Sequence, residues 1–270
     1  MDLKFIKMHG CGNDFVIIDN RPQQLELDKD EITLLCDRHY GIGCDQLVFI
    51  NKSNKTNVAA HALFWNSDGS VSATCGNATR CVASILFKET GKETIDIETP
   101  NGVIECYKKN NNLISVNMGK PKIAWDKIPL SKEVSTLKLP LEGEPTGTNF
   151  GNPHCTFFVD DLNGIDVQNQ GQIIENHMLF PQKTNVQFVK ILDRARIKVR
   201  VWERGAGITL ASGSSSCAAV DAGIRKGLLD NRVIVELEGG TVEVEKKETG
   251  VWLTGPTKDV FFGRYNLIRN

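Results

Sequence analysis

Residues 74–83, TCGNATRCVA, and residues 211–219, ASGSSSCAA, are two versions of one motif. Each places a cysteine or serine before a glycine and small polar residues, and each then continues into an alanine-rich segment. Cys75 and Ser212 hold the equivalent positions, 137 residues apart (212 − 75). Small polar residues before an alanine-rich segment are typical of a helix start, where the first backbone amides have no acceptors in the helix. The motif therefore predicts two equivalent turns that each open a helix.

Three further pairs of segments repeat in the same order at nearly the same shift. Residues 12–15 (GNDF) correspond to residues 151–154 (GNPH), and the strand-like segment that ends at Trp65 corresponds to the one that ends at Trp202. The third pair shows alternating apolar patterns around a glycine-containing turn, which are typical of hairpins, at residues 95–106 and 233–245. Four matches in one order predict a chain built from two copies of one unit.

The repeated unit is predicted to consist of a strand, a turn, a helix, a hairpin and a third strand. Two-residue hairpin turns join antiparallel neighbours, so its sheet should be mixed or antiparallel. We therefore predict an α/β (α+β) fold of two pseudo-symmetric halves, each a mixed or antiparallel sheet wrapped around a central helix. The predicted first half is residues 1–118 with 256–270, and the second is residues 119–255.

Two connecting segments complete this prediction. Residues 120–145, rich in proline and lysine, are expected to form the crossover between the halves. Residues 256–270 are expected to return to the first half, because Val260, Phe261 and Phe262 have apolar surface to bury. The active site is expected in the cleft between the halves, where small-molecule sites tend to lie.

Composition excludes several classes of partner. The 32 Lys and Arg residues nearly balance 33 Asp and Glu residues, so the net charge of −1 predicts binding to neither nucleic acid nor an anionic membrane. A charged N-terminus and the lack of a membrane-spanning stretch predict a cytoplasmic protein with a small-molecule substrate.

The 8 cysteines lack the C-x-x-C pairs of metal sites, so we expect no metal site and mostly buried thiols.

Cys75 and Ser212 indicate the chemistry. A helix start offers backbone amides and the positive end of a dipole, so two such turns aimed at one point could hold a carboxylate and stabilise charge on its α-carbon. The sequence carries no convincing signature of an electron-sink cofactor such as pyridoxal phosphate, and we expect none. Inversion without a cofactor needs one group to take a proton from one face and a second to return one to the other. A thiolate and a thiol suit this task, since a helix start lowers a thiol pKa.

At these residues the sequence resembles the diaminopimelate epimerase family, over essentially its full length. The matching stretches are residues 8–15, 43–46, 66–70, 75–77, 151–154, 184–186 and 203–207. The resemblance implies an isomerase that converts LL-2,6-diaminopimelate to the meso form by a two-base thiol/thiolate mechanism without a cofactor. It places the protein in lysine and peptidoglycan biosynthesis, as a possible homodimer.

The resemblance also implies the site residues. Cys75 is one catalytic base, and Ser212 holds the position of the other. The backbone amides that bind the reacting carboxylate belong to Gly76, Asn77, Gly213 and Ser214. The residues that hold the substrate's amines and distal carboxylate are Asn13, Asn66, Asn152, Asn185, Glu203 and Arg204, and the same pocket is lined by Gln46 and His154. Taken alone, these residues would be read as turn asparagines, a core histidine and a solvated strand end.

Two positions depart from the family pattern. The family has Ala-Cys-Gly where this chain has Ala211-Ser212-Gly213, and usually Gly-Glu-Thr where this chain has Gly207-Ile208-Thr209. A serine hydroxyl without an adjacent base is too weak an acid to form an alkoxide in useful amount. We therefore interpret the chain as a form inactivated by Cys-to-Ser replacement at 212, introduced deliberately or acquired by natural divergence.

Two other functions remain as alternatives. In the related proline racemase group, a hydroxyl residue replacing one cysteine accompanies dehydration, so the chain could be a hydroxy amino acid dehydratase or another racemase of that group. It could also be a non-catalytic diaminopimelate-binding paralogue. The motif set for a two-ended substrate argues against the first alternative: Asn66, Asn152, Asn185 and Arg204.

Overall fold

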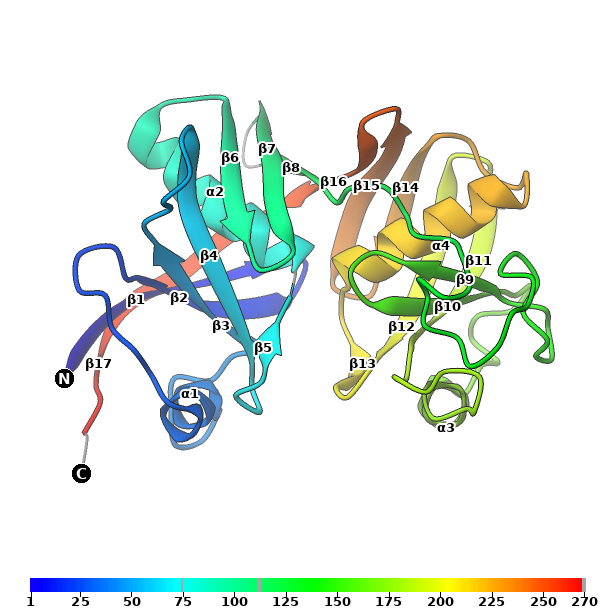
Figure 1. Cartoon of the computed structure of the whole chain (residues 1–270), viewed down its shortest axis with the longest axis horizontal. Helices are drawn as coiled ribbons and strands as arrows, with labels where there is room; N and C mark the ends of the chain where they lie inside the picture. Colours follow the sequence, from blue (N-terminus) through cyan, green and yellow to red (C-terminus); the bar gives the residue numbers. More distant parts are fainter. Residues whose placement is uncertain (74, 111–112, 269–270) are drawn as a thin grey trace. The chain divides into compact units, whose positions relative to one another are not determined.

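The computed structural model describes residues 1–73, 75–110 and 113–268 (Figure 1). Thr74 of the repeated motif and residues 269–270 of the C-terminal segment lie outside this described part. The chain divides into two compact units, residues 1–116 with 255–270 and residues 117–254. None of the described helices is both long enough and apolar enough to cross a membrane.

The first unit contains a mixed sheet and two helices. Its elements are β1 (Asp2–Gly10), β2 (Asn13–Asp19), α1 (Lys29–Cys36), β3 (Gln46–Asn51), β4 (Val58–Asn66), β5 (Val71–Ser72), α2 (Gly76–Thr90), β6 (Thr94–Thr99), β7 (Gly102–Asn110), β8 (Leu113–Asn117) and β17 (Lys258–Asn266). The strand order is β17-β1-β2-β3-β4-β6-β7-β8, with β5 beside β4. The pairs β2–β3 and β4–β6 are parallel and the others antiparallel.

The second unit repeats this arrangement. Its elements are β9 (Thr146–Asn149), β10 (Pro153–Phe158), α3 (Val167–Glu175), β11 (Asn185–Asp193), β12 (Arg196–Glu203), β13 (Gly207–Thr209), α4 (Gly213–Arg225), β14 (Arg232–Leu237), β15 (Gly240–Lys247) and β16 (Gly250–Pro256). The strand order is β9-β10-β11-β12-β14-β15-β16, with β13 beside β12 and parallel pairs at β10–β11 and β12–β14. The predicted pseudo-symmetric α+β fold is confirmed. However, each unit has several strands and a short helix before its central helix, where the predicted unit had a single strand.

A central helix organises each unit. In α2, all but one of residues 76–87 are buried, and the helix contacts β1, β2, β4, β6 and β7 (Figure 1). In α4, all but one of residues 213–223 are buried, and the helix contacts strands β9 to β12 and β15. Small side chains allow this close approach: alanine, glycine, serine and cysteine make up most of α4 and are interspersed along the buried part of α2.

A short helix covers part of the other face of each sheet. Ile32 and Leu35 of α1 pack against Leu47 and Phe49 of β3 in one buried cluster. Asp28 begins α1 with a capping box, in which its side chain accepts from the Glu31 amide and the Glu31 carboxylate accepts from the Asp28 amide. In the second unit, α3 contributes to an equivalent cluster with Val186 and Phe188 of β11.

Two sequence expectations about connecting segments need correction. Residues 120–145 do more than connect, because Ile128, Leu130 and Leu139 are buried in the core of the second unit. The C-terminal segment does return to the first unit, where β17 pairs with β1. However, Val260, Phe261 and Phe262 stay 52%, 46% and 70% exposed. The reason is that β17 is an edge strand.

The turn after β12 is anchored to α3 by a buried carboxylate. Glu175 accepts from the indole nitrogen of Trp202 at 2.7 Å and from the backbone amide of Gly205 at 3.1 Å. Gly171 lets the helix approach the indole, since a Cβ at that position would lie 2.5 Å from the Trp202 ring. This contact positions the Glu203-Arg204 turn.

We predict that Gly171→Ala lowers the free energy of unfolding by about 1–3 kcal/mol, because overpacking against the rigid indole outweighs the better helix propensity of alanine. Gln172→Ala, at the exposed next position of α3, is the matched control and should change stability by less than about 0.5 kcal/mol. Urea unfolding followed by tryptophan fluorescence measures both. An unchanged midpoint for Gly171→Ala would show that α3 does not depend on this close approach.

Candidate active site

Cys75 is the N-cap residue of α2. Its backbone is extended (φ −148°, ψ 105°), and its Sγ accepts a hydrogen bond from the Ala78 amide at 3.4 Å. Gly76 and Asn77 form the first turn behind it, and both are buried. The first amides of a helix create a local positive potential, which favours a thiolate at Cys75 and a carboxylate beside it.

Ser212 is the N-cap residue of α4 and has nearly the same backbone conformation (φ −134°, ψ 119°). Its side chain behaves differently, because it makes no capping hydrogen bond to the helix. Instead its Oγ donates to Glu203 Oε2 at 2.9 Å, and the second carboxylate oxygen accepts from Thr209 Oγ1 at 2.7 Å. Gly213 and Ser214 follow in the first turn of α4, matching Gly76 and Asn77. The two turns are therefore equivalent in backbone and different in side-chain chemistry.

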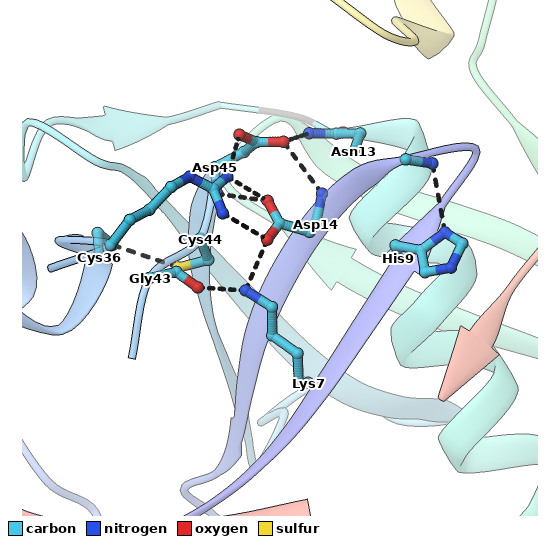
Figure 2. Close-up of polar contacts among 10 residues, drawn as sticks. Lys7, His9, Asn13, Asp14, Cys36, Gly43, Cys44 and Asp45 are labelled. Carbon is cyan, nitrogen blue, oxygen red and sulfur yellow. Dashed lines mark hydrogen bonds and ion pairs between the residues drawn. The ribbon is translucent and has the colours of Figure 1, made fainter. Parts of the chain in front are cut away.

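Asn13 is held by both ends of its side-chain amide, and Figure 2 shows the end that contacts Asp45. Its Oδ1 accepts from Asn77 Nδ2 at 3.1 Å, and its Nδ2 donates to Asp45 Oδ2 at 2.8 Å. Asp45 Oδ2 also accepts from the backbone amide of Asp14 at 3.0 Å. Because the Asp45 carboxylate can only accept, it fixes the orientation of the Asn13 amide. The oriented Asn13 oxygen then accepts from Asn77, so these two predicted substrate residues support each other.

Two cations hold the carboxylates beneath Asn13 (Figure 2). Arg38 forms a bidentate pair with Asp14 at 2.7 and 3.0 Å and reaches Asp45 at 2.9 Å. Lys7 contacts Asp14 at 2.6 Å and donates to the carbonyl of Gly43. Burial works against ionisation of Asp14, but the hydrogen bonds from Arg38 and Lys7 outweigh it and hold the pKa of Asp14 well below its usual range. The result is a rigid charged support.

Gln46 and Asn66 lie opposite each other on the paired strands β3 and β4. Gln46 Nε2 donates to Asn66 Oδ1 at 2.9 Å, and Asn66 Nδ2 donates to Ser70 Oγ at 3.0 Å. The structure thus brings together two residues that lie 20 positions apart in the sequence. Each amide nitrogen has two hydrogens and donates one of them in these bonds.

Asn185 connects β10 to the turn that carries Arg204. Its Nδ2 donates to the carbonyl of Pro153 at 2.8 Å, and its Oδ1 accepts from the backbone amide of Arg204 at 3.0 Å. The Arg204 side chain is exposed and donates to the carbonyl of Gln182 at 3.1 Å. Since Asn185 is almost wholly buried, it orients the Arg204 turn.

His154 is fully buried on β10. Its Nε2 lies 2.8 Å from Asn152 Oδ1, and its Nδ1 lies 2.7 Å from Gln187 Nε2. Burial, and secondarily the positive charge of Arg204, lower the pKa of His154 to about 3. The ring is therefore neutral at physiological pH and is no proton donor of the imidazolium type.

The predicted residues thus fall into separate groups within each unit. The first unit joins Asn13 to Asn77 and Gln46 to Asn66, and it places Cys75 and Gly76 at the start of α2. The second unit joins Asn152 to His154, Asn185 to Arg204 and Glu203 to Ser212, and it places Gly213 and Ser214 at the start of α4.

Several supporting residues were missed by sequence reasoning: Lys7, Arg38, Asp45, Glu175, Gln187 and Thr209. A signal existed for two of them, since Asp45 lies inside the motif at residues 43–46 and Gln187 interrupts the apolar strand NVQFV. The seven cysteines expected to be core residues are all buried. Within the described ranges, no group of His, Cys, Asp and Glu side chains is arranged to hold a metal ion.

Solved structures with this fold carry other activities. A phenazine biosynthesis protein of the PhzF family from Bacillus anthracis has a TM-score of 0.71 at 15% identity, covering 99% of this chain and 100% of its own. A hydroxyproline epimerase from Agrobacterium vitis has a TM-score of 0.71 at 11% identity, covering 97% of this chain and 92% of its own. At such identities the likeness concerns the fold alone.

Sequence similarity is much closer for one family. The family model described as diaminopimelate epimerase matches residues 5–124 and 147–260. The diaminopimelate epimerase of Pelagibacter ubique (strain HTCC1062) is 44% identical over 270 residues, covering 96% of this chain and 97% of its own. The chain belongs to the diaminopimelate epimerase family.

Proposed function

We propose that the chain binds 2,6-diaminopimelate and that the two helix starts act on one α-carbon of it, with Cys75 as a catalytic base. One observation carries this proposal: Cys75 and Ser212 occupy the same N-cap position on the equivalent helices of two units with the same strand pairing. The first-turn amides would bind the reacting carboxylate and stabilise the carbanion formed beside it. They belong to Gly76, Asn77, Gly213 and Ser214.

Ser212 is poorly suited to be the second acid. Its proton already lies in a hydrogen bond to Glu203, so giving that proton to a carbanion would leave an alkoxide next to a carboxylate. At the observed 2.9 Å this repulsion is on the order of 5 kcal/mol for an effective dielectric constant of about 20. A hydroxyl is also a far weaker acid than a thiol. We therefore expect Cys75 to remove and return the proton on one face only.

We predict that one stereoisomer of diaminopimelate exchanges its α-hydrogen in heavy water with little net inversion. Cys75 takes the proton, its thiol exchanges with solvent, and a deuteron returns to the same face. Ser212→Cys should restore inversion by about 100-fold or more, which is the usual contribution of a positioned acid. Mass spectrometry for deuterium and chiral chromatography for configuration are applied to the same sample.

The control is Cys75→Ser, which should abolish exchange in the parent chain. In the Ser212→Cys variant it should abolish inversion and leave only the exchange that the new thiol catalyses on the opposite face. Rapid inversion by the parent chain would contradict this account of Ser212. Turnover of hydroxyproline or another hydroxy amino acid, without any exchange on diaminopimelate, would favour the dehydratase alternative. Tight binding of diaminopimelate with no exchange would favour a binding protein.

The second amino-acid end of the substrate requires its own recognition. The exposed Arg204 guanidinium suits a carboxylate, and the Asn66 amide is oriented by Gln46 and Ser70 so that one hydrogen remains for a ligand. Both residues sit on well-supported turns, so their truncation should remove a contact with little change in fold.

We predict that Arg204→Ala and Asn66→Ala each weaken diaminopimelate binding by about 1.5 kcal/mol or more, the value of a hydrogen bond to a charged group. Isothermal titration calorimetry measures the affinity. Arg194→Ala and Asn54→Ala, at exposed positions of the same two units, are matched controls and should bind normally. Unchanged affinity in both test variants would mean that the second end is recognised elsewhere.

We further propose a cytoplasmic homodimer. The 8 cysteines are all free thiols, which suits a reducing compartment. Consecutive exposed apolar residues on the edge strand β17, Val260 to Phe262, are the kind of surface that a monomer covers by pairing with another chain.

We predict that Phe262→Lys shifts the protein toward monomer in sedimentation velocity at micromolar concentration, because a lysine on this edge opposes pairing. Tyr40→Lys, at another exposed aromatic residue of the same unit, is the control and should not change the mass. A parent chain that sediments as a monomer would contradict the proposal.

A further inference from the structure

A buried polar network under the start of α4 contacts both ring nitrogens of His154. We propose that Gln187 is a positioning residue that holds His154 in the Nε2–H tautomer, and that this tautomer sets which end of the Asn152 amide faces the substrate. The first step concerns the free protein alone. The second step rests on the proposed function, because it assumes that Asn152 contacts diaminopimelate.

Strand register brings the members of this network together. His154 and Thr156 lie two residues apart on β10, so their side chains share one face of the sheet. Gln187 on the parallel strand β11 pairs with Thr156. Ser215 lies on α4, which packs over these strands. The side chains of His154, Thr156, Gln187 and Ser215 are all completely buried, so each polar atom must find its partner within the protein.

The Gln187 amide has its donors and its acceptor committed. Nε2 lies 2.7 Å from His154 Nδ1 and donates to Ser215 Oγ at 3.0 Å. Oε1 accepts from Thr156 Oγ1 at 3.0 Å. An amide nitrogen has two hydrogens and no acceptor capacity, so one hydrogen goes to Ser215 and the other to His154. The Nδ1 atom must therefore be the unprotonated nitrogen of the ring.

A neutral imidazole with an unprotonated Nδ1 carries its hydrogen on Nε2. That hydrogen is donated to Asn152 Oδ1 at 2.8 Å. The alternative of a doubly protonated ring is disfavoured by burial and by the charge of Arg204, which together lower the pKa of His154. Gln187 thus acts on Asn152 through the ring without touching it.

The consequence for the substrate concerns a single amide. With Oδ1 turned to His154, Asn152 offers its Nδ2 hydrogens, which suit a carboxylate. In the opposite tautomer, the unprotonated Nε2 would accept a hydrogen bond from the Asn152 amide nitrogen. The Asn152 amide oxygen would then face outward and repel the same carboxylate. Gln187, held on β11 beside β10, therefore sets whether Asn152 offers hydrogen-bond donors or an acceptor to the ligand.

The decisive experiment is ¹⁵N NMR of the His154 ring in uniformly labelled protein without substrate. The parent chain should show a protonated Nε2 and an unprotonated Nδ1. Gln187→Glu keeps the size of the side chain but replaces the donor with an acceptor, so Nδ1 should become protonated. Gln168→Glu, which adds the same charge at an exposed position of α3, is the matched control and should leave the ring signals unchanged.

Gln187→Met provides a second variant in case a buried glutamate prevents folding. It retains the bulk and removes the donor, so Nδ1 should lose its hydrogen-bond shift and the ring should sample both tautomers. The parent spectrum, Gln187→Glu and Gln187→Met each test the inference independently. A protonated Nδ1 in the parent chain, or an unchanged ring in the folded variants, would overturn it.

Binding separates this inference from the proposed function. Gln187→Glu should weaken diaminopimelate binding about tenfold, the effect of losing one hydrogen bond to a charged group, whereas Gln168→Glu should bind like the parent. A tautomer switch with unchanged affinity in a chain that binds diaminopimelate would overturn the step from Asn152 to the substrate. If the parent chain binds no diaminopimelate, the proposed function fails, and the ring spectra still decide the role of Gln187.

Discussion

The burial of α2 and α4 is the constraint on which the rest of the structure depends. Most of each helix is buried against its own sheet, including polar side chains such as Arg80 and Asp221. Its first backbone amides still need acceptors. The start of each helix is therefore the place where an anion is favoured, and Cys75 and Ser212 stand at these starts.

An oxygen at position 212 in place of a sulfur changes the hydrogen-bond partner of the N-cap side chain. The sulfur of Cys75 accepts from the helix and stays within the field of its amides. The hydroxyl of Ser212 turns to Glu203, which also holds Thr209. A strong acceptor close by wins over a weak capping contact, because a charge-assisted hydrogen bond is roughly twice as strong as a neutral one. The same backbone turn thus supports two different side-chain states.

Asparagine and glutamine residues around both helix starts depend on supports that lie behind them. Asp45 fixes the amide of Asn13, and Gln187 acts on Asn152 through His154. An amide alone is ambiguous, since its two ends are nearly equal in shape and opposite in hydrogen-bonding character. A neighbour that presents only a donor or only an acceptor to one end of the amide removes that ambiguity. Much of the polar interior serves to orient a few amides.

The duplicated α+β fold, the helix starts at positions 75 and 212 and the family could all be predicted from the amino-acid sequence, because these features depend on local patterns that repeat along the chain. The sequence also indicated the buried cysteines. The exposed edge of β17, the Glu203 partner of Ser212 and the support residues Lys7, Arg38 and Glu175 emerge only in the folded chain. Strand register and side-chain packing join residues that are far apart in the sequence, such as Arg38 with Asp14 and Gln187 with His154. A linear pattern carries no record of those pairings, since hydrogen-bond partners are fixed by distance in space.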